Sequence, residues 1–242
     1  MGPGRSAGAE GTGRAGAIGY RLVPGDDLGP GDLARIRAIY EDGFPEHLRA
    51  DFRSVVTGRQ PGEVALALTG DGEPCGFALL RPLGPAGQAA GPGRTSWIYL
   101  RYFVIDAARR GRGIGGVLWD LLTARLRDDG YALLVFDVED PDEPGCGPEE
   151  SRERTRRIAF YTRHGAAVLP VTGYRTPGGD EVAPEWTPMV LMAASLTGEA
   201  SPLRTAAQVR EVVEAVYRYR WSLPPGHPQV AATRLAGRDW LR

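Results

Sequence analysis

The sequence predicts an α+β fold built around a mixed, mostly antiparallel sheet. Residues 60–105 read as successive strands with no helical pattern between them, which is typical of antiparallel pairing. Apolar residues then recur at i, i+3, i+4, i+7 and i+8 from Ile114 to Leu126, as on one face of a helix. The nearly continuous apolar run Tyr131–Val138 that follows is typical of a strand buried on both faces.

The first elements are a strand and one or two helices. Gly19–Val23 has the pattern of a short strand, and Asp32 is expected to cap the helix that follows. The apolar face of this helix consists of Leu33, Ile36 and Ile39. The segment around Phe44, Pro45 and Phe52 reads as a broken second helix or a loop.

A hairpin and a long strand complete the first half. Val64–Thr69 and Cys75–Leu83 are expected to pair across the turn Gly70-Asp71-Gly72. A loop rich in proline and glycine, Gly84–Gly93, leads into the strand that ends at Ile105.

The second half adds further strands and a helix. Gly130 is expected just after the end of the central helix. Ala166–Arg175 and Thr187–Ala193 read as two strands separated by a polar turn. Ser201-Pro202 is expected to start another helix. One face of that helix carries Val209, Val212, Val213 and Val216.

The turn between Ile105 and the central helix is the most informative stretch. It reads DAARRGRGIGG, residues 106–116, with glycines that let a backbone approach closely and arginines that add positive charge. A turn of this kind before a helix points backbone N–H groups at one place, as phosphate-binding sites do. We therefore expect a phosphorylated cofactor here.

Two cofactor motifs fit this turn, and a purely structural turn is a third interpretation. The dinucleotide pattern G-x-G-x-x-G is matched by Gly111, Gly113 and Gly116, with Asp137 as the ribose-binding acid. It is disfavoured because residues 106–110 separate the strand from the first glycine, and because residues 60–105 lack strand–helix–strand units. The pattern R-x-x-G-x-G, the pyrophosphate loop of acetyl-CoA-dependent acyltransferases, is matched by Arg110, Gly113 and Gly115.

With this loop, the order of elements and the segment Ala159–Ala166 (AFYTRHGA), the chain resembles the GNAT superfamily of acetyl-CoA-dependent N-acetyltransferases. The resemblance spans about Gly19 to Ala193. It implies a three-layer αβα fold whose central sheet splays into a V, with acetyl-CoA or CoA as cofactor. It assigns the pantetheine arm to Phe103, Val104 and Ile105, and the pyrophosphate to Arg110, Gly111, Arg112, Gly113, Ile114, Gly115 and Gly116.

The chemistry implied by the resemblance is direct attack of an amine on the acetyl thioester. Tyr161 falls where family members commonly have a tyrosine at the end of the pantetheine slot. A phenol with an ordinary pKa near ~10 is protonated at neutral pH and can donate a proton to the leaving thiolate. The other interpretation is a helix tyrosine that packs against the sheet.

A base must also take a proton from the attacking amine. Some family members carry a glutamate on the strand before the loop, but that position is Tyr99 here. Others use a carboxylate on the next strand, where this chain has Asp137, so Asp137 is the predicted base. An acid that caps a turn or pairs with an arginine is an equal alternative. Glu139, Glu41 and a base acting through water stay open.

An acidic insert, EDPDEPGCGPEE, occupies residues 139–150. Such a flap would attract a cationic substrate to the site. The alternative is a solvated, disordered loop, and the basic residues of the next segment, Ser151–Arg157, could simply pair with its acids.

Composition limits the classes of partner. A net charge of −1 gives no indication of nucleic-acid binding, and two cysteines indicate neither a metal site nor a disulfide framework. No apolar stretch is long enough to cross a membrane. Residues 1–17 lack the apolar core of a signal peptide and read as a disordered tail, so a cytoplasmic protein is expected.

The predicted organisation is this tail, an acetyltransferase domain over residues 18–194, and a helical extension over residues 195–242 that covers the core or a dimer contact. The predicted activity is acetyl transfer from acetyl-CoA to a primary amine of a small molecule or peptide. A hydroxyl acceptor and a longer acyl chain are alternatives. A non-catalytic acyl-CoA sensor is an alternative of another class, and a dinucleotide enzyme is the least favoured.

Overall fold

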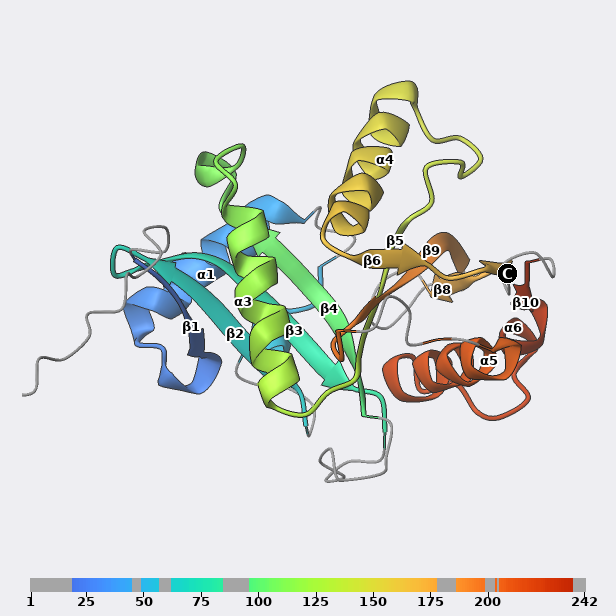
Figure 1. Ribbon diagram of the computed structural model, residues 1–242. Helices are drawn as coiled ribbons and strands as arrows, with labels where there is room; N and C mark the ends of the chain where they lie inside the picture. The colour runs from blue at the N-terminus through green and yellow to red at the C-terminus, as the bar shows by residue number, and fades with distance from the viewer. Residues whose placement is uncertain are drawn as a thin grey trace, which may run out of the picture.

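The computed structural model describes residues 19–44, 49–56, 62–84, 96–177, 186–198, 203 and 205–236. Its centre is a mixed sheet with strand order β1-β2-β3-β4-β5-β9-β6, and β8 pairs with β9. The pair β4–β5 is parallel, whereas the other neighbouring strands run antiparallel. Helices cover both faces, so the three-layer arrangement expected from the sequence is confirmed (Figure 1).

The strands are β1 (Tyr20–Pro24), β2 (Val64–Gly70), β3 (Glu73–Pro82), β4 (Trp97–Ile105), β5 (Leu133–Glu139), β6 (Ala166–Val168), β7 (Val171–Thr172), β8 (Arg175–Pro177), β9 (Trp186–Ser195) and β10 (Arg234–Leu235). The helices are α1 (Pro30–Gly43), α2 (Phe52–Val56), α3 (Ile114–Asp128), α4 (Pro148–Arg163), α5 (Ala206–Ala215) and α6 (Pro228–Ala232). A π-helical turn, Val216–Arg220, continues α5. The strands β7 and β10 form a small separate ladder.

Helices α3 and α4 pack on one face of the sheet; in Figure 1, α3 lies in front of the strands and α4 lies above β5 and β6. The α3 side chains Trp119, Leu122 and Leu126 pack with Tyr161 of α4 against Phe136 of β5 in the largest core cluster. This is the apolar helix face that the spacing predicts, and Gly130 has the positive φ (85°) of a residue that follows a helix.

The opposite face is covered by two separate groups of elements. Ile36, Ile39 and Tyr40 of α1 pack on β2, β3 and β4, at the N-terminal half of the sheet. Val209 and Val213 of α5 pack on β4, β5 and β9 in another cluster. The segment after β9 therefore shares a hydrophobic core with the sheet, and the predicted valine face of α5 is confirmed.

Several predicted boundaries differ from the structure. Helix α1 begins at Pro30 with Gly29 as its N-cap, so Asp32 lies in the first turn and is not the cap. Proline at the first helical position needs no N–H partner, which explains the earlier start. Helix α5 begins after Thr205, whose side chain and that of Gln208 form a capping box, rather than at Ser201-Pro202.

The segment predicted as one strand, Ala166–Arg175, is interrupted. It contains β6 and β7 and the first residue of β8, because the chain leaves β9 after Val168 and β7 pairs with β10 instead. The predicted tail, the loop after Gly84 and the polar turn after Pro177 lie outside the described residues. Among the described helices, none is both long and apolar enough to span a membrane.

Candidate active site

The central feature of the site is the short contact between β4 and β5. Their parallel pairing covers Trp97↔Leu133, Ile98↔Leu134 and Tyr99↔Val135, and both described strands continue past it without pairing to each other. The β3–β4 register shifts between Leu79 and Leu80, which leaves an extra residue, Arg101, as a bulge in β4. A bulge bends and twists its strand, so it turns the end of β4 away from β5. The splay expected from the sequence is confirmed.

Phe103, Val104 and Ile105 lie beyond this divergence. On one side they pair with Ala78, Phe77 and Gly76 of β3, so their other edge faces the wedge between β4 and β5. The backbone groups on that edge are therefore placed where an extended ligand could add a strand. Gly76 lets the two strands come close, because an added Cβ would lie 2.6 Å from the Val104 carbonyl oxygen.

The glycine turn follows the C-terminal end of β4 directly. Asp106 caps a short 3-10 turn, Ala107–Arg109, by accepting a hydrogen bond from the Ala108 N–H at 3.1 Å. Gly111 and Gly113 have φ values of 75° and 78°, a region that favours glycine, and Gly113 is the N-cap of α3. The free N–H groups of the first turn of α3 therefore open directly onto this loop.

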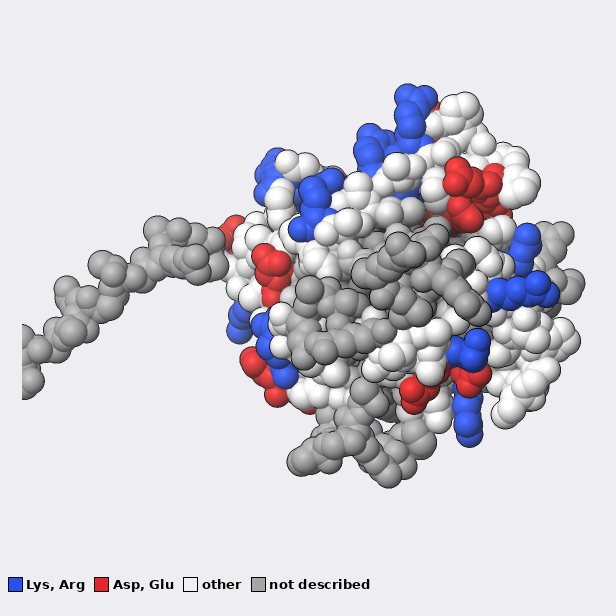
Figure 2. All heavy atoms as spheres, turned by 45° about the vertical axis from the view of Figure 1, so that its right-hand side comes forward, with Lys and Arg blue, Asp and Glu red and all other residues white. Residues whose placement is uncertain are grey.

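The arginines of the turn have different partners. Arg109 is partly buried and lies 3.7 Å from Glu73 and 4.0 Å from Asp106, so its charge is already paired. Arg110 donates from Nε to the Ile105 carbonyl at 3.1 Å, while Arg112 is exposed. Figure 2 shows basic side chains along the upper edge of the molecule, over this turn and over α4.

Two of the predicted loop glycines contact α4. An added Cβ at Gly115 would lie 3.5 Å from the Phe160 ring, and one at Gly116 would lie 2.9 Å from Cε1 of His164. Close packing of α3 on α4 therefore accounts for these positions, whereas Gly111 and Gly113 have open space around them.

Tyr161 is buried where the wedge begins. Its ring centroid lies 4.5 Å from that of Phe136 on β5 and 6.1 Å from that of Phe103 on β4. Trp119 of α3 closes the cluster at 5.2 Å. Burial raises the pKa of Tyr161 to about 12, so its hydroxyl is protonated at neutral pH. Tyr161 therefore contacts side chains of both diverging strands, β4 and β5.

Asp137 lies on the opposite face of β5. It lies on the same face of β5 as Leu133 and Val135, which pack in the cluster under α5, while Phe136 faces α3 and α4. The Tyr174 hydroxyl donates to Oδ2 of Asp137 at 2.7 Å, and the Tyr99 hydroxyl lies near the same carboxylate. Burial raises the pKa of Asp137, although the two tyrosine hydroxyls and the nearby charge of Arg220 lower it.

The other carboxylates considered as bases have ion-pair partners. Glu139 pairs with Arg157 of α4, and Glu41 pairs with Arg37 at 2.7 Å. From the sequence, Tyr99 was noted only as the position where some family members carry a glutamate. Tyr174 and Arg220 were not identified as site residues. No local pattern marks the last two, because they reach Asp137 only through the strand order and the packing of the C-terminal segment.

The acidic insert is folded over the described residues 139–150. Arg154 of α4 is buried and pairs with Glu143 at 2.7 Å and with Glu150 at 2.6 Å. It also donates to the Asp140 carbonyl at 2.7 Å. The interpretation of the insert as a disordered loop is therefore wrong, and pairing with the following basic segment is confirmed.

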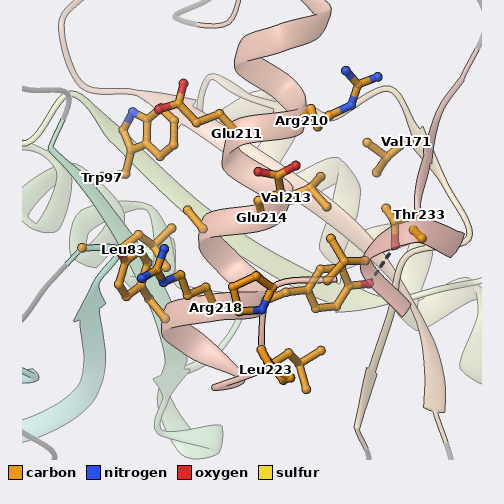
Figure 3. Close-up of a pocket in the computed structure, with 18 of the residues that line it drawn as sticks. Leu83, Trp97, Val171, Arg210, Glu211, Val213, Glu214, Arg218, Leu223 and Thr233 are labelled. Carbon is orange, nitrogen blue, oxygen red and sulfur yellow. Dashed lines mark hydrogen bonds between the residues drawn. The ribbon is translucent and has the colours of Figure 1, made fainter. Parts of the chain in front are cut away.

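A cavity of about 990 Å³ lies between the C-terminal segment and the start of β4. Trp97, Arg218 and Leu223 are among its lining residues (Figure 3). In the described part of the chain, none of the predicted site residues lines it, although it lies on the face that carries Asp137. Nor do the described residues contain a group of three or more His, Cys, Asp or Glu that could hold a metal ion.

Residues 33–166 match the family model described as acetyltransferase (GNAT) family. No protein with curated annotation matches the chain in sequence.

Many solved structures share the fold, and three of them are as follows. A Bacteroides thetaiotaomicron protein described as a GNAT-family acetyltransferase is 18% identical, with a TM-score of 0.60, over 84% of this chain and 99% of that one. The ribosomal-protein-S18-alanine N-acetyltransferase from Escherichia coli is 15% identical, with a TM-score of 0.51, over 77% and 99%. An aminoglycoside 6'-N-acetyltransferase complexed with coenzyme A is 19% identical, with a TM-score of 0.52, over 73% and 97%.

Proposed function

The chain belongs to the GNAT family of acetyltransferases, and from that premise we propose that it transfers an acetyl group from acetyl-CoA to a primary amine by direct attack. The observation that carries the proposal is the wedge between β4 and β5, with a protonated tyrosine on one face and a carboxylate on the other. These are the acid and the base that the reaction needs.

The residues around the wedge fit acetyl-CoA. The unpaired edge of β4 at Phe103, Val104 and Ile105 would take the pantetheine arm. The N-terminus of α3, with open space at Gly111 and Gly113, would take the pyrophosphate. Arg110, Arg112, Ile114, Gly115 and Gly116 complete the proposed cofactor set. The fold neighbour solved with coenzyme A supports this assignment.

Bound acetyl-CoA supplies the acetyl group as a thioester. In the proposed reaction the amine nitrogen forms a bond to the acetyl carbonyl carbon, and the carbon–sulfur bond breaks. Asp137 accepts the proton that the amine loses, and the Tyr161 hydroxyl donates a proton to the leaving sulfur. The raised pKa of Asp137 makes it a stronger base than an exposed aspartate.

The acceptor is proposed to be an amine of a small molecule or a peptide. The N-acetyltransferases among the fold neighbours include one named for an aminoglycoside and one named for a protein alanine, and both classes remain candidates. Arg154 and Arg157 neutralise part of the acidic insert, so the insert gives little support to a specifically cationic acceptor.

Calorimetric titration with acetyl-CoA, CoA and NAD tests the cofactor assignment. We expect binding of the first two and none of NAD. Release of free thiol is then followed with acetyl-CoA and a panel of amines and matched alcohols. Acetyl-CoA binding without thiol release for any acceptor would favour the acyl-CoA sensor, and transfer to alcohols alone would favour an O-acyltransferase. Binding of NAD alone would overturn the proposal.

A further inference from the structure

The Asp137 carboxylate lies next to tyrosines from two other elements. Tyr174, which lies between β7 and β8, donates to its Oδ2 at 2.7 Å. Tyr99 of β4 belongs to the last residue pair before the wedge and lies near the same carboxylate. Because the Tyr174 hydroxyl donates to the carboxylate from a separate element, it sets the orientation of that side chain.

The C-terminal segment in turn holds Tyr174. The ring of Tyr217, which is fully buried, lies 5.4 Å from the Tyr174 ring. The Tyr217 hydroxyl donates to the carbonyl of Arg175, the next residue, at 3.0 Å. The same hydroxyl lies 2.9 Å from Oγ1 of Thr233, the bond drawn in Figure 3. The position of Tyr174 therefore depends on residues on both sides of α6.

The C-terminal segment also places the positive charge of Arg220 next to Tyr99. The Arg220 guanidinium lies 5.9 Å from the Tyr99 ring centroid and 3.9 Å from that of Trp221. Tyr217 and Arg220 both belong to the π-helical turn Val216–Arg220. Turns of this kind are rare in helices and are frequent at functional sites.

We propose that the C-terminal segment, residues 205–236, supports the active site through Tyr217 and Arg220, and that Tyr174 and Arg220 are positioning residues for the Asp137 carboxylate. This inference rests on the proposed function, because it takes Asp137 as the base. It assigns to the segment a role in catalysis beyond covering the core.

The titratable and charged groups that face Asp137 define the expected effect. They are Tyr99 of β4, Tyr174, Arg220 of the π turn and Glu139 of β5 itself. The hydrogen bond from Tyr174 and the charge of Arg220 both favour the ionised carboxylate. Removing either one raises the pKa of Asp137, so the acid limb of the kcat/KM profile moves to higher pH.

The test compares Tyr174→Phe and Arg220→Met with two controls in the same π turn, Tyr219→Phe and Arg218→Met. The Arg218 guanidinium lies 5.3 Å from the Tyr219 ring centroid, and both side chains line the 990 Å³ cavity. Neither is among the groups that face the Asp137 carboxylate. We expect the two test variants to shift the acid limb to higher pH and to lower kcat at pH 7 by about tenfold, a loss of about 1.4 kcal/mol. We expect the controls to keep the wild-type profile.

The KM for acetyl-CoA should stay unchanged in all four variants. Tyr174→Phe removes a single oxygen atom and is expected to fold. If Arg220→Met does not fold, the pH profile of Tyr174→Phe is sufficient to test the inference. A lower melting temperature with an unshifted pH profile would show a merely structural role and overturn the inference.

Asp137→Asn separates this inference from the proposed function. If Asp137→Asn loses activity while Tyr174→Phe and Arg220→Met keep the wild-type profile, the base stands and the positioning role is wrong. If Asp137→Asn keeps full activity, the assignment of the base is wrong, and the positioning role fails with it.

Discussion

Tyr161 and Asp137 approach the wedge from opposite faces of the sheet and are linked through one strand residue. The Phe136 ring lies 4.5 Å from the Tyr161 ring, and Asp137 is the next residue along β5, so its side chain points the other way. The proposed acid therefore lies on the side of α3 and α4, and the proposed base lies on the side of α5. In the proposed reaction, the thiol and the amine would therefore lie on different sides of the same opening.

Tyr161→Phe is expected to lower kcat by about 10²- to 10⁴-fold, because the leaving sulfur loses its proton donor. The dissociation constant for CoA should change little, since the ring packing with Phe136 and Trp119 is kept. Steady-state kinetics and calorimetric titration of CoA measure the two effects. Unchanged kcat would mean that Tyr161 is a packing residue only.

Asp137→Asn is expected to remove activity while leaving the protein as stable as the wild type or more stable at pH 8. The folded-state pKa of Asp137 is raised by burial, so keeping the group ionised costs folding free energy above that pKa. The cost disappears as the pH falls below the ordinary value of an aspartate. Melting temperatures of both proteins at several pH values should therefore differ at pH 8 and converge in acid. A variant that is less stable at pH 8 would contradict this assignment of the shift.

Arg112→Gln is expected to raise the dissociation constant for acetyl-CoA by about two- to tenfold, as for one exposed charge near a phosphate. Arg109→Gln is the matched comparison within the same turn. Its effect should be smaller, because Arg109 already faces Glu73 and Asp106. Titrations at low and high salt measure both. An equal loss in the two variants would argue against a direct phosphate contact by Arg112.

Gly76→Ala is expected to lower the free energy of unfolding by about 1–3 kcal/mol and also to weaken acetyl-CoA binding. The added Cβ would meet the Val104 carbonyl oxygen at 2.6 Å, so β4 must shift where the cofactor would pair. Gly84→Ala is the control, since nothing lies within 4 Å of its added Cβ. Denaturant unfolding and titration follow the two effects, and a stable Gly76→Ala with normal binding would show that β4 adapts freely.

Arg154→Met is expected to destabilise the protein by about 1–3 kcal/mol, because it leaves Glu143 and Glu150 without their shared cation. Arg152→Met, on the exposed side of the same helix, should change stability by less than about 0.5 kcal/mol. Thermal unfolding compares the two. Equal stability of both variants would show that the insert does not depend on this buried arginine.

Local signals in the sequence predicted much of the fold. The hairpin depends on Asp71 and Gly72, which have φ values of 55° and 84°, and such turns have a recognisable composition. The apolar stripe of α3 and the glycines at 111 and 113 are likewise properties of neighbouring residues. The pair Thr205 and Gln208 was also visible as a capping box, so the start of α5 was open to prediction from the sequence.

The rest depends on contacts between distant residues. Tyr174 and Asp137 are brought together because β9 lies between β5 and β8 in the sheet, and no short pattern encodes that order. The bulge at Arg101 arises from the register between two strands, and a strand pattern alone does not reveal it. The buried role of Arg154 likewise follows only from how the insert folds back on α4.

The three residue pairs between β4 and β5 also bear on how the molecule unfolds. On either side of this short ladder the sheet is an antiparallel unit with its own core cluster, one under α1 and one under α5. Few backbone hydrogen bonds join the two units, and otherwise the core cluster under α3 and α4 holds them together, so local opening is expected to begin at this junction. An extended ligand that fills the wedge would add hydrogen bonds across this junction. Binding of the cofactor should then make unfolding more cooperative, with amide protection rising along the end of β4.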